Sequence, residues 1–106
     1  MEGISLQISE LRVELFEPLV GQIFNLAMDG RTEFYPFELV QARVSRHSKA
    51  GGKRRQPFSL LFKGPDKYAF PQATYRVAHD ALGELKLFLV PVVLDEEGRF
   101  LEAVFN

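Results

Sequence analysis

Turn-forming residues divide this 106-residue chain into short apolar runs, and that spacing constrains the fold more than any other feature. The clearest turns are Asp29-Gly30, Gly64-Pro65 and the segment 95–98, whose residue types favour tight reversals. No segment between the runs is long enough for the helical crossover that joins parallel strands. We therefore expect a mainly β fold, a small antiparallel barrel of five to six strands with a short N-terminal helix.

The apolar runs give the approximate strand positions. Alternation along 73–79 is typical of a half-buried strand, whereas the near-continuous apolar run 85–94 indicates a central strand or a barrel stave. Pro36 marks the start or an edge of its strand, because proline cannot donate to a sheet ladder. The expected strands are 22–28, 34–44, 58–62, 73–79, 85–94 and 100–105.

One segment near the N-terminus has a helical pattern. Ser9 is a candidate N-cap, and Leu11, Leu15 and Phe16 are spaced to share one face. Pro18 should end the segment, because the residue before a proline is driven out of the helical region. The sequence predicts a two-turn helix over about 9–16, docked on the core because so short a helix is marginal alone.

Composition favours one domain, residues 1–106, with an aromatic core. Hydrophobic residues make up 46% of the chain and ten are Phe; each buried aromatic ring removes about 150–250 Å² from water. The absence of cysteine excludes a disulfide scaffold, a thiolate metal site and a cysteine nucleophile. The segment 1–10 lacks the basic and apolar regions of a signal peptide, and no run reaches the roughly 18–20 apolar residues of a membrane span. We expect a cytoplasmic protein without a membrane partner.

Several blocks of the sequence recur together in a known family. They are PFSLLFKGP at 57–65, PQATY at 71–75, LFLVP at 87–91 and EAVFN at 102–106, with His79 to Gly83 and an N-terminal piece containing Phe16 and 19–22. Together they resemble the signature of a family of small uncharacterised bacterial proteins. Because that family has no established activity, the resemblance implies no catalytic residue.

The order of a short helix followed by bent strands is also similar to the Sm-like or SH3-like small β-barrel. Sm-like proteins bind RNA through an Asp followed by Asn and through a late Arg-Gly pair. This chain has neither; its Gly98-Arg99 is reversed and lies in an acidic turn. The architectural resemblance therefore carries over no RNA site, and fold alone does not give function.

Two segments invite a catalytic or phosphate-binding interpretation. His79, Asp80 and Glu84 could support acid–base chemistry, but neighbours in a strand point to opposite faces. The alternative places His79 at a strand end, with Asp80 accepting turn hydrogen bonds. The segment 64–67 lacks the Gly-Lys-Ser/Thr core of a phosphate loop. We expect no catalytic residue, no metal, no cofactor and no enzymatic activity.

The remaining candidate is a basic segment with no acidic residue between 43 and 55, whose loop at 45–56 we expect to be weakly ordered. Three interpretations stay open: a solvated loop, a contact with a protein partner, or a contact with phosphates. The candidate contact residues are Arg43, Arg46, Lys49, Lys53, Arg54 and Arg55. Tyr35, Tyr68 and Phe70 lie near turns and could be exposed aromatic anchors.

We predict a non-enzymatic binding or assembly module whose unknown partner is another protein or a second copy. The alternative is an Sm-like nucleic-acid-binding protein that uses the basic segment 43–55.

Overall fold

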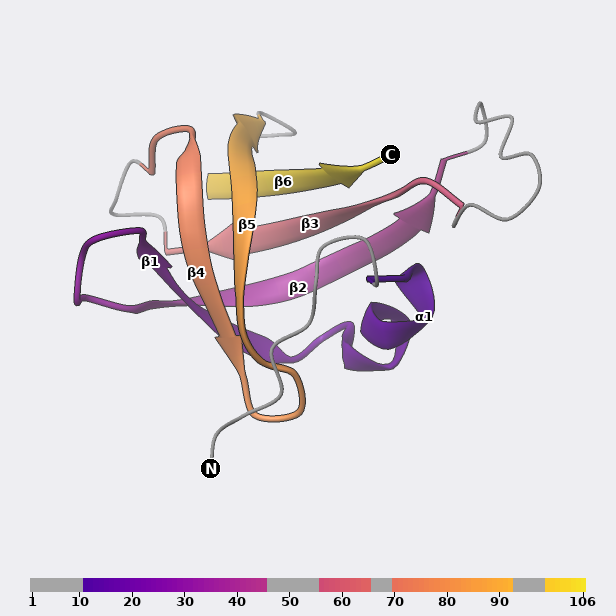
Figure 1. Ribbon diagram of the computed structural model, residues 1–106, viewed down its shortest axis with the longest axis horizontal. Helices are drawn as coiled ribbons and strands as arrows, with labels where there is room; N and C mark the ends of the chain where they lie inside the picture. The colour runs from indigo at the N-terminus through magenta and orange to yellow at the C-terminus, as the bar shows by residue number, and fades with distance from the viewer. Residues whose placement is uncertain (1–10, 46–55, 66–69, 93–98) are drawn as a thin grey trace.

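The computed structural model describes residues 11–45, 56–65, 70–92 and 99–106 (Figure 1). A short helix and one 3₁₀ turn precede six strands. The elements are α1 (Val13–Phe16), η2 (Glu17–Leu19), β1 (Ile23–Met28), β2 (Tyr35–Val44), β3 (Phe58–Gly64), β4 (Ala73–His79), β5 (Gly83–Val92) and β6 (Arg99–Phe105). The strands expected from the sequence are confirmed to within two residues wherever their ends are described.

The strands close into an antiparallel barrel in the order β1-β2-β3-β6-β5-β4. This order joins two three-stranded meanders, β1-β2-β3 and β4-β5-β6, by pairing β3 with β6 and β1 with β4. The expected mainly β fold, a six-stranded antiparallel barrel with a short N-terminal helix, is therefore confirmed. Closure also puts β1 opposite β6 across the barrel.

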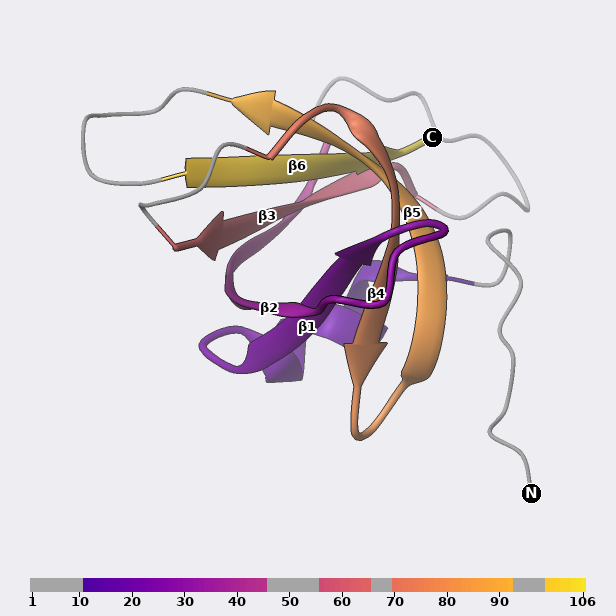
Figure 2. The ribbon, with the colours of Figure 1, turned by 90° about the vertical axis from the view of Figure 1, so that its left-hand side faces the viewer.

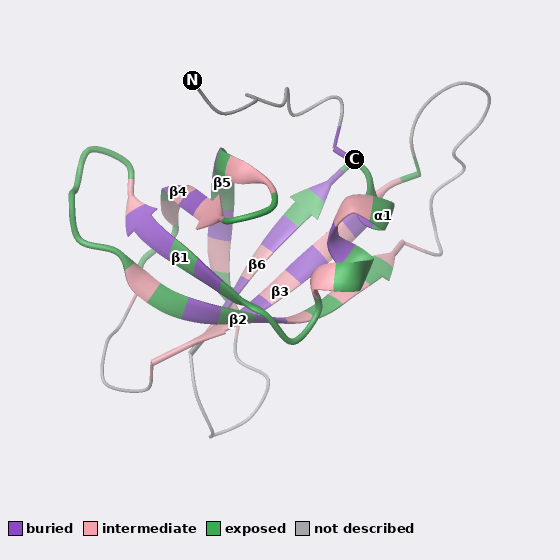
Figure 3. Cartoon of the chain, turned by 90° about the horizontal axis from the view of Figure 1, so that it is seen from below, coloured by how far each residue is buried: buried purple, intermediate pink, exposed green. Residues whose placement is uncertain are grey.

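Buried and more exposed residues alternate along the strands, as the coloured bands in Figure 3 show. The buried side chains fill the barrel interior. In β5 the buried positions are Leu85, Leu87 and Leu89, so the apolar run there is a barrel stave with Phe88 pointing outward. Aromatic rings dominate one end of the core, where Phe58 and Phe105 stack with centroids 4.4 Å apart. Six Phe and one Tyr are buried: Phe16, Phe24, Phe37, Phe58, Phe62, Tyr75 and Phe105.

The helix is shorter than the sequence predicts. Arg12 is the N-cap and has an extended backbone, with φ −133° and ψ 154°. Leu11 before it is fully buried, so the chain enters the core extended and coils from Val13. The proposed cap Ser9 lies outside the described residues. The α-helix ends at Phe16, as predicted, but the chain keeps turning through Pro18, because this residue lies at the start of η2, where its missing N–H is not needed.

A close contact between β2 and β3 explains the glycine at the end of β3. Glu38 pairs with Lys63, so Phe37 and Gly64 face one another across the two strands. A Cβ at Gly64 would overlap three atoms of the Phe37 ring, with Cδ2 at 2.8 Å. Gly64 therefore does more than start the expected turn at Gly64-Pro65: it makes room for a buried ring.

Candidate binding site

Among the described residues, the shortest ladder of the barrel joins β5 and β6. β6 pairs with β3 along its whole length, from Arg99 to Phe105. In the same described ranges it shares three residue pairs with β5, which join Val90–Val92 to residues 100–102. Figure 2 shows the two strands side by side at this point and β5 then curving away. Toward its start, β5 has β4 as a neighbour on one side and, among the described residues, no strand on the other.

The direction of the backbone groups on β5 follows from the alternation of antiparallel ladders. Thr74 O accepts a hydrogen bond from Asp29 N, so Thr74 of β4 faces β1. Its neighbours Ala73 and Tyr75 then face β5, where they pair with Leu89 and Leu87. The alternate residues of β5, Lys86 and Phe88, therefore direct their N–H and C=O groups away from β4 and into the open seam.

A groove of 790 Å³ follows this seam, and we call it the seam groove. Phe88 of β5 and Val104 of β6 are its exposed hydrophobic residues, 54% and 63% accessible. By the same alternation Val104 faces the seam with its backbone, because Glu102 two residues earlier pairs with Val90 there. The lining residues are Thr74, Lys86, Leu87, Phe88, Val90, Glu102, Ala103, Val104, Phe105 and Asn106.

A second groove of 620 Å³ lies on the other side of the end of β6 and shares residues 102 and 104–106 with the first. Arg43, Ser59 and Val104 form one row across β2, β3 and β6 in this region. Arg43 is exposed, whereas Glu102 is half-buried. Both grooves combine an apolar floor with a few charges, and together they flank the end of β6.

Arg43 is the one predicted contact residue that falls within the described part of the chain, and it lines the second groove. Arg46, Lys49, Lys53, Arg54 and Arg55 lie outside the described residues, as does most of the loop expected to be weakly ordered. The residues on either side of that segment meet at the groove, where Ser45 N donates to Pro57 O at 2.9 Å and both residues line it. The described residues Ser45 and Pro57, on either side of 46–55, therefore lie at the second groove.

The suggested acid–base group does not form one site. His79 Nδ1 accepts from Ala81 N at 2.9 Å, and His79 Nε2 lies 2.8 Å from Gln22 Oε1. Glu84 instead pairs with Arg76, at 3.6 Å. A backbone N–H can only donate, so Nδ1 is the acceptor and the imidazole caps the β4–β5 turn. Asp80 is exposed beside it; the side-chain turn bond predicted for Asp80 is made by His79.

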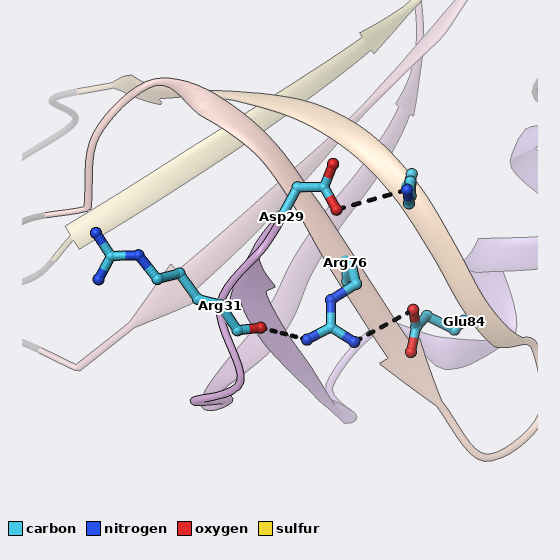
Figure 4. Close-up of polar contacts among 5 residues, drawn as sticks. Asp29, Arg31, Arg76 and Glu84 are labelled. Atoms are coloured by element: carbon cyan, nitrogen blue, oxygen red, sulfur yellow. Dashed lines mark hydrogen bonds and ion pairs between the residues drawn. The ribbon is translucent and has the colours of Figure 1, made fainter.

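A polar network covers the neighbouring outer face of β4 (Figure 4). The Arg76 guanidinium donates to Arg31 O, pairs with Glu84 and lies 4.9 Å from the centroid of the Phe34 ring. Lys86 Nζ lies 3.5 Å from Asp29 Oδ1. These polar groups satisfy one another, so the polar face of β4 is self-contained and contrasts with the apolar seam beside it.

Two of the aromatic anchors considered from the sequence, Tyr35 and Phe70, are not free. Phe70 is half-buried against the rings of Tyr35 and Phe37, with centroids 5.3 and 4.9 Å away, and Tyr68 lies outside the described residues. Sequence reasoning missed Phe88 and Val104. A signal was present, because each is out of phase with the buried series of its strand, 85/87/89 and 101/103/105.

Within the described ranges, no three His, Asp or Glu side chains gather in a way that could hold a metal ion. In the same part of the chain, no helix is long and apolar enough to cross a membrane.

Comparison with known families gives one match. The model of a domain of unknown function, DUF6916, matches residues 11–105. This agrees with the resemblance to an uncharacterised family inferred from the sequence blocks. Comparison with curated proteins and with solved structures gives no match.

Proposed function

Because the chain belongs to the DUF6916 family, whose function is unknown, we propose a function from its own surface: it is a non-enzymatic module that binds a protein partner in the seam groove. The observation that carries this proposal is that one groove contains both the exposed Phe88 and Val104 and an open strand edge. Exposed strand edges bind other chains unless they are blunted or covered, and exposed apolar clusters are typical of protein contacts.

The chemistry of the groove favours a protein over a nucleic acid. Protein surfaces that bind nucleic acids are strongly positive and polar, whereas the seam groove exposes Phe88 and Val104 and, among the described residues, has Lys86 as its one basic lining residue. The Sm-like alternative relies on the basic segment, of which Arg43 lines the second groove rather than the seam groove. The cysteine-free sequence suits the reducing cytoplasm, where we expect the module to act.

The test is selection of phage-displayed random 12-residue peptides on the full chain, followed by binding to single variants. Phe88→Gln and Val104→Gln should each weaken binding of the selected peptides at least about fivefold, because each removes an apolar anchor worth about 1–3 kcal/mol. Ile23→Gln is the matched control: Ile23 is 53% exposed but lies on β1, across the barrel from β6. It should leave binding within twofold of the unmodified protein.

Two results would contradict the proposal. Selected peptides that bind all three variants equally would show that the seam groove is not the binding surface. Tight binding of a 20-nucleotide RNA or DNA at 50 mM salt, lost in Arg43→Glu and kept in Phe88→Gln, would favour the nucleic-acid alternative.

A further inference from the structure

We infer that the partner enters the seam groove as an extended segment and adds to β5 as a new antiparallel strand. This inference rests on the proposed function and specifies how the groove is used. Its basis is the open edge of β5, where Lys86 and Phe88 direct their backbone groups into the groove. Strand addition at such an edge obtains affinity from main-chain hydrogen bonds and specificity from alternate side chains.

The fold offers a starting point for that strand. β6 occupies the position next to β5 at Val90–Val92 and then diverges to follow β3. A segment that takes over from β6 continues the same ladder toward the start of β5. The open stretch from Gly83 to Leu89 allows about five to seven residues of pairing at about 3.4 Å each. The added segment, antiparallel to β5, therefore runs in the same direction as β6 does where β6 pairs with Val90–Val92.

The side chains along the edge specify the chemistry of the segment. Residues directly opposite one another in a ladder place their side chains on the same face. A segment residue opposite Phe88 therefore meets an exposed ring, and one opposite Lys86 meets a lysine side chain that is 62% exposed. The residue between them points inward, toward buried Leu87 and Ala103.

From its N-terminal to its C-terminal end, the antiparallel segment should have an apolar residue opposite Phe88, then a small apolar residue, and then an acidic residue opposite Lys86. The acidic residue can share Lys86 with Asp29, because an ammonium has three N–H donors. Charge complementarity also favours an acidic partner at the end of β6, where exposed Arg43 lies.

The experiment uses a fluorescent dodecapeptide with a central Val-Ala-Glu, measured by fluorescence polarisation against the full chain. In the inferred register the Val and Glu amides donate to β5, and the Ala amide does not. N-methylation of Val or Glu should weaken binding about fivefold to tenfold, since each removes one hydrogen bond worth about 1 kcal/mol. N-methylation of Ala is the matched control and should have less than a twofold effect.

A charge exchange tests the register. Lys86→Glu should weaken the Glu peptide about fivefold, and a peptide with Lys in place of Glu should recover binding to that variant. Hydrogen exchange gives an independent readout. The amides of Lys86 and Phe88 should gain protection when the peptide binds, whereas the amide of Leu87, which already faces Tyr75 of β4, should not change.

The outcomes separate this inference from the proposed function. Strand addition would be overturned, and the binding module left intact, by two results together. The library peptides would require Phe88 and Val104, and the Val-Ala-Glu peptide would either not bind or bind equally well after every N-methylation. A dimer in sedimentation equilibrium that Phe88→Gln dissociates would assign the groove to a second copy and overturn the inference of a separate partner. If substitution of Phe88 or Val104 does not change the affinity of the library peptides, both proposals are overturned.

Discussion

Gly64→Ala is expected to destabilise the barrel although it replaces glycine within a strand. Alanine usually stabilises such a position by about 0.4–1 kcal/mol, because it restricts the unfolded chain. Here the new methyl group would overlap the Phe37 ring, whose exposed fraction is 0% and whose centroid lies 4.9 Å from that of Phe70. Overpacking of this kind costs about 1–3 kcal/mol. The net loss of unfolding free energy should therefore be about 1–2 kcal/mol.

Urea unfolding followed by far-ultraviolet circular dichroism measures this loss. With a slope of about 1.5 kcal/mol per molar urea for a domain of this size, the midpoint should fall by about 1 M. Gly30→Ala is a matched control with a different cause. Gly30 has φ +87° and nothing within 4 Å of an added Cβ, so its cost of about 1 kcal/mol comes from the backbone alone.

A double variant isolates the contact between the ring and the methyl group. Phe37→Leu leaves space over Gly64 for the new methyl group. The loss of unfolding free energy that Phe37→Leu causes should therefore be at least 1 kcal/mol smaller in the Gly64→Ala variant than in the unmodified protein. The cost of Phe37→Leu should be the same with or without Gly30→Ala. The reasoning is refuted if Gly64→Ala is as stable as the unmodified protein, or if its cost simply adds to that of Phe37→Leu.

Three further measurements probe the core and the surface. Phe16→Ala should cost about 3–5 kcal/mol in urea unfolding, because a fully buried ring between Phe58 and Phe105, 6.0 and 6.4 Å from their centroids, leaves a cavity; a loss under 1 kcal/mol would show that α1 is not part of the core. Burial raises the pKa of Tyr75, whose hydroxyl donates to Pro71 O at 2.6 Å, so the folded state holds this proton more tightly than the unfolded state and stability should fall as the pH rises above about 10. The Tyr75→Phe variant should have a free energy of unfolding about 1 kcal/mol lower at pH 8. Its free energy of unfolding should also fall less steeply between pH 9 and 11. An equally steep fall in the variant would assign the pH dependence to other groups. Lys86→Ala should change stability by less than about 0.5 kcal/mol, because its pair with Asp29 is exposed on both sides; a larger loss would make Lys86 unsuitable for the charge exchange.

The sequence by itself determined the strands and the aromatic core. Turn residues such as Asp29-Gly30 and the period-two alternation of 73–79 are local signals, and each limits a strand without information from the rest of the chain. The start of the helix was not predictable in this way. Leu11 is buried in the core and Arg12 after it has an extended backbone, so tertiary packing overrides the local helical pattern at these two residues.

The candidate site depended more strongly on tertiary structure. Charge patterning located Arg43, and the phase of Phe88 relative to residues 85, 87 and 89 signals that its side chain points outward, but no local feature marks Phe88 as a ligand contact. Its exposure matters because, among the described residues, the end of β5 pairs with β6 over three residues and β6 then diverges to follow β3, which puts Phe88 and Val104 on one open groove. Where the strands of a closed barrel separate depends on the twist and pairing of the whole sheet. That seam is therefore a property of the assembled barrel rather than of any one segment.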